Sequence, residues 1–158
     1  MNYGQDLGAI ARKIIDSIVY MVLGTANETG RPWVSPVYFA SEKYREFYWM
    51  SSPDVTHSRN IVLRPQVSIV IFDSRVPVGT GQAVYMSAVA EEITVVELDR
   101  GTEIYNGRFQ NPAGHGVLII KPEDVQSPAP YRLYRAAALE HWILDPTSRP
   151  DHRIPVTI

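Results

Sequence analysis

The densest group of side chains able to bind a ligand lies in one short segment, Met50–Arg59, with the sequence MSSPDVTHSR. The segment ends an apolar strand pattern, continues through hydroxyl side chains and enters a helical pattern. Backbone N–H groups at a helix start, hydroxyls, His57 and Arg59 suit a phosphate. Asp54 counts against an anion there. Helix capping by serine beside a surface arginine explains the same residues, so both interpretations stay open at this point.

Motifs with fixed spacing for other chemistries are absent from the sequence. There is no GxGxxG after a strand, no P-loop, no HExxH and no GxSxG. The chain has no cysteine, which excludes disulfides, thiolate catalysis and cysteine-ligated metal sites. The four histidines are scattered, so no metal site is predicted: His57, His115, His141 and His152.

Composition indicates an ordinary globular chain. It has 158 residues, of which 45% are hydrophobic and 20% charged, with a net charge of −2. This length predicts one domain over 1–158. With this net charge, the chain has no excess of positive charge that would attract nucleic acid. No apolar run approaches the roughly 20 residues of a membrane span, and the N-terminus lacks a signal-peptide pattern. We therefore expect a cytoplasmic protein without nucleic-acid or membrane partners.

Hydrophobic spacing predicts a first helix and then strands. The helix runs over 7–18 and Asp6 caps it. A hairpin turn over 27–30 joins the first two strands. Pro36 lies inside the second strand and predicts either a bulge or an edge there. The strands of this half are expected over 20–26, 32–40 and 46–51.

In the second half of the chain, predicted helices alternate with predicted strands. Ser52 is expected to cap a helix that ends near Arg64. Thr94 and Glu97 form a capping box for a helix over 95–105, although Gly101 weakens that helix. Strands are expected over 66–73, 82–93, 117–121 and, as one or two strands, 131–145. The fold class is therefore mainly β (α+β), an antiparallel barrel with a few short helices. Its core spans about 20–145, and 146–158 forms an extended arm that clasps a dimer.

Three runs of sequence resemble one family in order and spacing. They are GRPWVSPVYF (30–39), EFYWMSSPDVTHSRNIVLRPQVSIVIFD (46–73) and GQAVYMSAVAEEI (81–93), and 131–145 follows more loosely. They are similar to the flavin-binding core of the pyridoxamine 5′-phosphate oxidase family over about residues 20–95. The resemblance implies a split β-barrel homodimer that binds FMN at the subunit interface.

The resemblance also implies roles for single residues. The second strand passes its backbone along the flavin ring, the end of the third strand and the following helix start hold the cofactor phosphate, and a glutamine reaches the flavin from the neighbouring subunit. A C-terminal arginine lies near the active site. In this order, the positions are Val34, Ser35, Pro36 and Val37; Met50, Ser51, Ser52, Thr56 and His57, with Arg59 nearby; Gln82; and Arg132.

The chain departs from the oxidase proper at charged positions. Thr56 and His57 replace a basic pair, Ser35 replaces an arginine and Ala40 replaces a lysine that binds the substrate phosphate. We therefore expect an FMN-dependent oxidoreductase that acts on a small molecule other than pyridoxamine phosphate. The alternatives are a reductase that uses the deazaflavin coenzyme F-420, a non-catalytic module that binds flavin or haem, and a structural dimer without a ligand.

Overall fold

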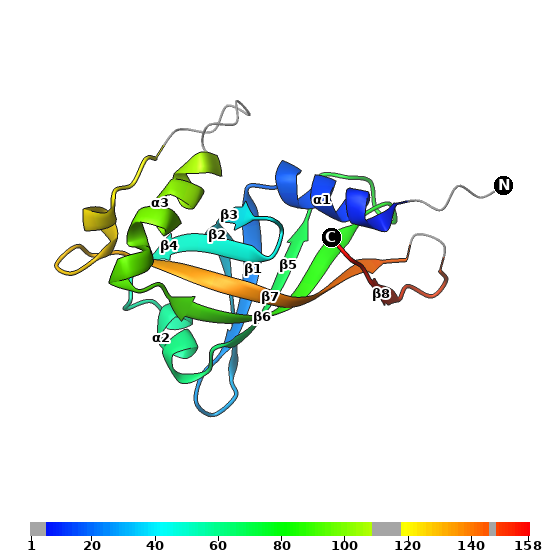
Figure 1. The fold of residues 1–158 in the computed structure, drawn as a ribbon. Helices are drawn as coiled ribbons and strands as arrows, with labels where there is room; N and C mark the ends of the chain where they lie inside the picture. Colours follow the sequence, from blue (N-terminus) through cyan, green and yellow to red (C-terminus); the bar gives the residue numbers. More distant parts are fainter. Residues whose placement is uncertain (1–5, 109–117, 146–147) are drawn as a thin grey trace.

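A computed structural model of the chain describes residues 6–108, 118–145 and 148–158. The strands of these segments form one antiparallel sheet that curls into a half-barrel (Figure 1). The strands are β1 (Tyr20–Ala26), β2 (Pro32–Tyr38), β3 (Ala40–Glu42), β4 (Glu46–Ser51), β5 (Gln66–Phe72), β6 (Ala83–Glu92), β7 (Arg132–Leu144) and β8 (Arg153–Pro155). The helices are α1 (Leu7–Ser17), α2 (Thr56–Leu63) and α3 (Leu98–Gly107), with short 3-10 turns at Val95–Glu97 and Pro122–Val125. This matches the mainly β class expected from the sequence.

The longest two strands, β6 and β7, join the halves of the sheet. The strand order is β2-β1-β5-β6-β7-β4-β3, and β8 pairs with β7 outside this path. Ser87 pairs with Glu140 and Ala88 with Ala138, so Leu139 is an extra residue on β7. Such a bulge bends a strand and increases its twist. The bend helps the two halves to curl toward one another.

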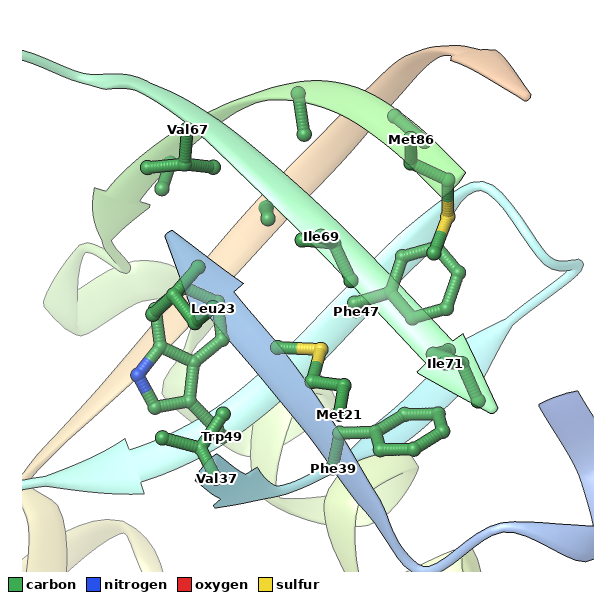
Figure 2. Packing of buried hydrophobic residues seen from close by; sticks show 14 of the residues in the cluster. Met21, Leu23, Val37, Phe39, Phe47, Trp49, Val67, Ile69, Ile71 and Met86 are labelled. Atoms are coloured by element: carbon green, nitrogen blue, oxygen red, sulfur yellow. The ribbon is translucent and has the colours of Figure 1, made fainter. Parts of the chain in front are cut away.

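The main core fills the inside of the curled sheet. Strand alternation places one side chain in two there, as in β1, where Met21 and Leu23 are fully buried. Figure 2 shows these two side chains lying close to Val37, Phe47 and Trp49 from other strands. α1 covers this core with its apolar face, and Ala11 and Ile15 are fully buried. Asp6 caps α1 by accepting a hydrogen bond from the Ala9 amide at 3.0 Å, as predicted.

A second cluster lies between α3 and the strands β3, β4 and β7. The predicted capping box forms at the start of this region, where the Glu97 carboxylate accepts from both the amide and the hydroxyl of Thr94. Gly101 lies where α3 packs tightly against its neighbours. A Cβ there would lie 2.4 Å from Cδ1 of Ile93 and 3.0 Å from Cδ2 of Leu133. The glycine that weakens the helix locally is therefore what lets it pack.

Two details differ from the sequence-based expectations, and the structure decides between the two alternatives at Pro36. α2 begins at Thr56 after an uncapped Val55, because Ser52 instead accepts from the Asp54 amide at 3.2 Å and closes a turn before the helix. Pro36 causes no bulge: β2 keeps continuous register with β1 and lies at the edge of the sheet. Residues 118–121 form no strand, because the Asn106 side chain binds both the amide and the carbonyl of Ile120.

The end of the chain lies against its own sheet. Residues 146–147 are outside the described residues, but β8 pairs with β7. Ile154, Val156 and Ile158 pack against the main core. A Cβ on Gly8 would lie 2.6 Å from the Thr157 carbonyl oxygen, so the tail also contacts α1 closely. A dimer-clasping role for the arm stays a prediction.

We predict that Gly101→Ala destabilises the protein by about 1–2 kcal/mol, because overpacking against buried Ile93 and Leu133 outweighs the gain in helix propensity. Urea unfolding measures the change. Gly107→Ala in the same helix is the control, since a methyl group added there would meet no described atom beyond its own helix within 4 Å. Equal stability of the two variants would contradict the proposed close approach.

Candidate functional site

A histidine joins two strands that share no ladder. His57 Nδ1 lies 3.1 Å from the Ser35 hydroxyl of β2, and Nε2 lies 2.9 Å from the Ser51 hydroxyl of β4. The indole N–H of Trp33 donates to the same Ser35 oxygen at 3.0 Å. The two serines are half-buried. We call these four side chains the serine–histidine cluster.

Local structure fixes the position of the cluster. β4 ends at Ser51, and one turn later α2 begins, with His57 as its second residue. α2 packs against β1 and β2 (Figure 1). Buried Asn60, one turn further along α2, donates to the Thr25 hydroxyl of β1 at 3.0 Å. This anchor holds the His57 ring between the two strands.

Burial sets the charge state of His57. The residue is 8% exposed, and burial lowers the pKa of its imidazole because desolvation disfavours the charged form. His141 on β7 has the same exposure, and burial lowers its pKa too. However, His141 Nε2 contacts the Tyr44 carbonyl oxygen at 2.8 Å, so it lies against backbone and not against hydroxyls. Both rings favour the neutral form in the folded chain.

Two hollows border β2. A groove of about 510 Å³ crosses β1, β2, β5, β6 and β7, and its lining includes Val22, Val34, Val70, Tyr85 and Trp142. Its volume falls in the range typical of small-molecule sites. A smaller cavity of about 270 Å³ is lined by Asn27, Arg31, Pro32, Trp33, Thr56 and Asn60. Val34 lines the groove and Trp33 lines the cavity, so successive residues of the strand border the two hollows.

The structure brings some of the sequence-predicted residues together. Ser35, Ser51 and His57 meet in the cluster, and Thr56 lines the small cavity beside it. Val34 is 62% exposed in the groove. Arg59 and Pro36 are exposed, and Ser52 forms the turn before α2.

Other predicted residues lie apart from the cluster. Val37 is buried in the main core, and Met50 packs against the second cluster under α3. Arg132 pairs with Ser51 in the β4–β7 ladder, but its guanidinium lies 3.5 Å from the Glu92 carboxylate and donates to the Ala129 carbonyl.

Gln82 lies beyond the far end of β6. The ten residues of β6 separate it from Arg132 and Ser51, a length of roughly 33 Å along the strand. Its side-chain oxygen is buried without a hydrogen-bond partner among the described residues. Within one chain, the structure therefore does not bring Gln82 to the cluster.

Sequence reasoning missed two residues at this site. Trp33 is 50% exposed, and its indole N–H donates to the Ser35 hydroxyl. Arg31 follows the hairpin turn and lines the small cavity. In the sequence, Arg31 could have been found because a cationic residue directly precedes a strand that borders a ligand site. No other pattern in the sequence marks it.

Neither a metal-binding group nor a membrane-spanning helix is found in the described part of the chain. Within it, no group of three or more His, Asp or Glu side chains could hold a metal ion. None of its helices has the length and apolar character needed to cross a bilayer. His115 lies outside the described residues.

Comparison with known proteins adds a family and a fold. The family described as pyridoxamine 5′-phosphate oxidase matches residues 8–129. No protein with a curated description matches the sequence. Solved structures match the fold at low sequence identity, and three of them illustrate the range.

The first is a heme binding protein from Mycobacterium smegmatis, with 17% identity and a TM-score of 0.67 over 91% of this chain and 55% of that chain. The second is a protein from Bacteroides thetaiotaomicron named for 5-nitroimidazole antibiotic resistance, with 14% identity and a TM-score of 0.66 over 85% and 81%. The third is an F-420 reductase, with 17% identity and a TM-score of 0.58 over 83% and 94%. These similarities establish the fold alone.

We predict that the free energy of unfolding falls as the pH drops below about 6.5. Burial lowers the pKa of His57 and His141 in the folded chain from 6.5, so the unfolded chain binds more protons there. The loss is at most about 1.4 kcal/mol per pH unit for each histidine. Urea unfolding between pH 8 and 5.5 measures it.

In the His141→Gln variant, the free energy of unfolding should fall less steeply with pH, because the contribution of one histidine is removed. Glu97 and Asp73 do not contribute in this range, because their lowered carboxyl pKa values act below pH 4.5. Stability that is constant from pH 8 to 5.5 would contradict the prediction.

Proposed function

The chain belongs to the pyridoxamine 5′-phosphate oxidase family, and on that premise we propose that it is an FMN-dependent oxidoreductase that binds its flavin between two copies of the chain. The serine–histidine cluster is the observation that carries this proposal. It places the hydroxyls of two half-buried serines, Ser35 and Ser51, beside the start of α2. Hydroxyl and backbone N–H donors of this kind bind phosphate.

The surroundings of the cluster fit the rest of a flavin. The groove bordered by Val34 lies on the other face of β2 from Ser35, so a flavin held at the cluster would pass over the β2 edge to reach it. There the groove offers apolar and aromatic surface, from Tyr85 and Trp142, to a planar ring. β2 is an edge strand, so one row of its backbone groups has no strand partner in the described sheet. These groups suit the polar edge of the ring. Arg31 in the small cavity supplies a positive charge near Thr56.

The chain's own contribution to the reaction is binding and orientation. FMN, when bound, supplies the hydride and electron transfer. Ser35 and Ser51 hold the phosphate, and the groove excludes water from the ring face. We assign no acid–base pair, and the substrate is a small molecule that enters beside the ring.

Pyridoxamine phosphate itself is a poor candidate for this substrate. Ala40 replaces the lysine implied by the family resemblance, and it is 1% exposed in the cluster under α3. Ser35 replaces an arginine, and its hydroxyl carries no positive charge. The chain therefore lacks the charges that would hold a second phosphate.

A homodimer explains the two features that one chain leaves incomplete. The groove exposes Val34 beside other apolar residues, and such surfaces commonly bind a partner. Gln82 has a buried side-chain oxygen without a partner among the described residues and lies away from its own cluster. A second copy packed on the groove would cover the ring and contribute Gln82 from the other subunit.

Coenzyme F-420 is the second candidate cofactor. Arg31 lines the small cavity, and Arg59 is exposed on α2 nearby. These cations suit its longer acidic tail. Haem has less support, because His57 and His141 already use ring nitrogens in internal hydrogen bonds. A parallel titration with FMN, F-420 and haem distinguishes the three cofactors.

We predict that the purified chain takes up FMN and acquires its visible absorption. Ser51→Ala should weaken FMN affinity about tenfold, because one hydrogen bond to a charged group is lost. Fluorescence titration of FMN measures the affinity, and Ser74→Ala in an exposed loop is the control. A colourless wild-type protein that takes up no FMN would overturn the proposed cofactor.

We also predict that Val34→Asp shifts a wild-type dimer toward monomer, because a carboxylate is costly to bury at an apolar interface. Analytical ultracentrifugation at micromolar concentration measures this shift. Val62→Asp on α2 is the matched control, since Val62 is 77% exposed and does not line the groove. A monomeric wild-type chain, or equal dissociation of both variants, would argue against this interface.

A further inference from the structure

The hydrogen bonds of His57 limit which serine can bind a ligand. A neutral imidazole donates from one ring nitrogen and accepts at the other. The Ser35 and Ser51 hydroxyls occupy these two nitrogens. In either tautomer, one serine must therefore point its proton at the ring. Only the other serine keeps its proton free to donate to a ligand.

Protonation of His57 removes this limit. An imidazolium donates from both nitrogens, so both serine oxygens would accept from the ring. The Trp33 indole can only donate, and it already points at the Ser35 oxygen. The protons of Ser35 and Ser51 would then both be free to point away from His57. The cluster would present two hydroxyl donors backed by a positive charge, which is an arrangement that favours an anion.

We propose that a phosphate group bound at Ser35 and Ser51 draws a proton onto His57, so that the cofactor and one proton bind together. This inference rests on the proposed function, because it takes the phosphate of the flavin as the anion. His57 is then a positioning residue that acts through the two serines. When the phosphate binds, the protonated His57 supplies a positive charge that Ser35 and Thr56 lack.

The surroundings leave His57 free to respond to such an anion. Burial is the cause that lowers its pKa, and the ring contacts the hydroxyls of Ser35 and Ser51 rather than a carboxylate. β1 and β2, which pack against α2, contain no Asp, Glu, Lys or Arg. The charged groups on the neighbouring segments are Arg31 in the small cavity, Asp54, Arg59 and Arg64 at the exposed surface of the α2 segment, Glu46 at the start of β4, and the Arg135–Glu91 and Arg132–Glu92 pairs. An arriving phosphate would therefore be the dominant new charge.

His141 provides a matched control within the same chain. It is also 8% exposed, and burial lowers its pKa too. Its Nε2 contacts the Tyr44 carbonyl oxygen, which can only accept. Protonating His141 would free no hydroxyl for a ligand. The coupling should therefore belong to His57 alone.

Calorimetric titration of the full chain with FMN tests this inference. At pH 7.5 the FMN phosphate is mostly a dianion, because its second pKa is about 6. Titrations in two buffers with different ionisation enthalpies give the number of protons taken up. Wild type and His141→Gln should take up a measurable fraction of a proton, approaching one as the pH falls toward 6.5, whereas His57→Gln should take up none. Riboflavin, which lacks the phosphate, should cause no uptake in any variant.

The pH dependence of affinity provides a second measurement. From pH 8.5 to 6.5, FMN affinity of the wild type should rise by as much as about tenfold per pH unit. The affinity of His57→Gln should stay level. Equal proton uptake in wild type and His57→Gln would overturn the inference while leaving FMN binding intact. Failure of the wild type to bind FMN would overturn the proposed function and this inference together.

NMR of the unsubstituted chain covers the case in which His57→Gln does not fold. The His57 ring resonances, assigned with the help of His141→Gln, should move from neutral to charged positions when FMN is added at pH 7. Riboflavin should leave them at their neutral positions. A His57 ring that stays neutral in the FMN complex would overturn the inference.

Discussion

The ladder between β6 and β7 is the constraint on which the remaining arrangement depends. It joins β2, β1 and β5 on one side to β4 and β3 on the other, and its bulge at Leu139 helps the sheet to bend. Because the sheet curls, β2 and β4 approach each other without forming a ladder. His57 occupies this approach and binds both strands. A straight sheet would hold Ser35 and Ser51 too far apart for one imidazole to join.

Patterns confined to a short stretch of sequence predicted most of the elements. The Asp6 cap, the box between Thr94 and Glu97, and the strand alternation each report local backbone preferences. The strand expected over 117–121 failed because a distant group decided the outcome. Asn106 binds the backbone of Ile120 in place of a neighbouring strand. Sequence spacing contains no information about such a contact.

The candidate site was predictable in part for the same reason. The segment from Met50 to Arg59 and the position of Ser35 could be identified from residue types and from family resemblance. The contact between Ser35 and His57 depends on how far the sheet curls, which no local pattern gives. Arg31 and Trp33 reach the site through the β1–β2 hairpin. Gln82 needs a second chain before its role can be tested, so neither the sequence nor a single chain decides it.

Pro36 has a consequence for how the protein behaves at high concentration. Edge strands with an unbroken row of amides can recruit strands from other molecules and start aggregation. Pro36 sits in the middle of edge strand β2, is exposed, and keeps its register with β1. A proline is tolerated there because its missing amide falls on the open side of the strand. The residue therefore interrupts the template for runaway strand addition.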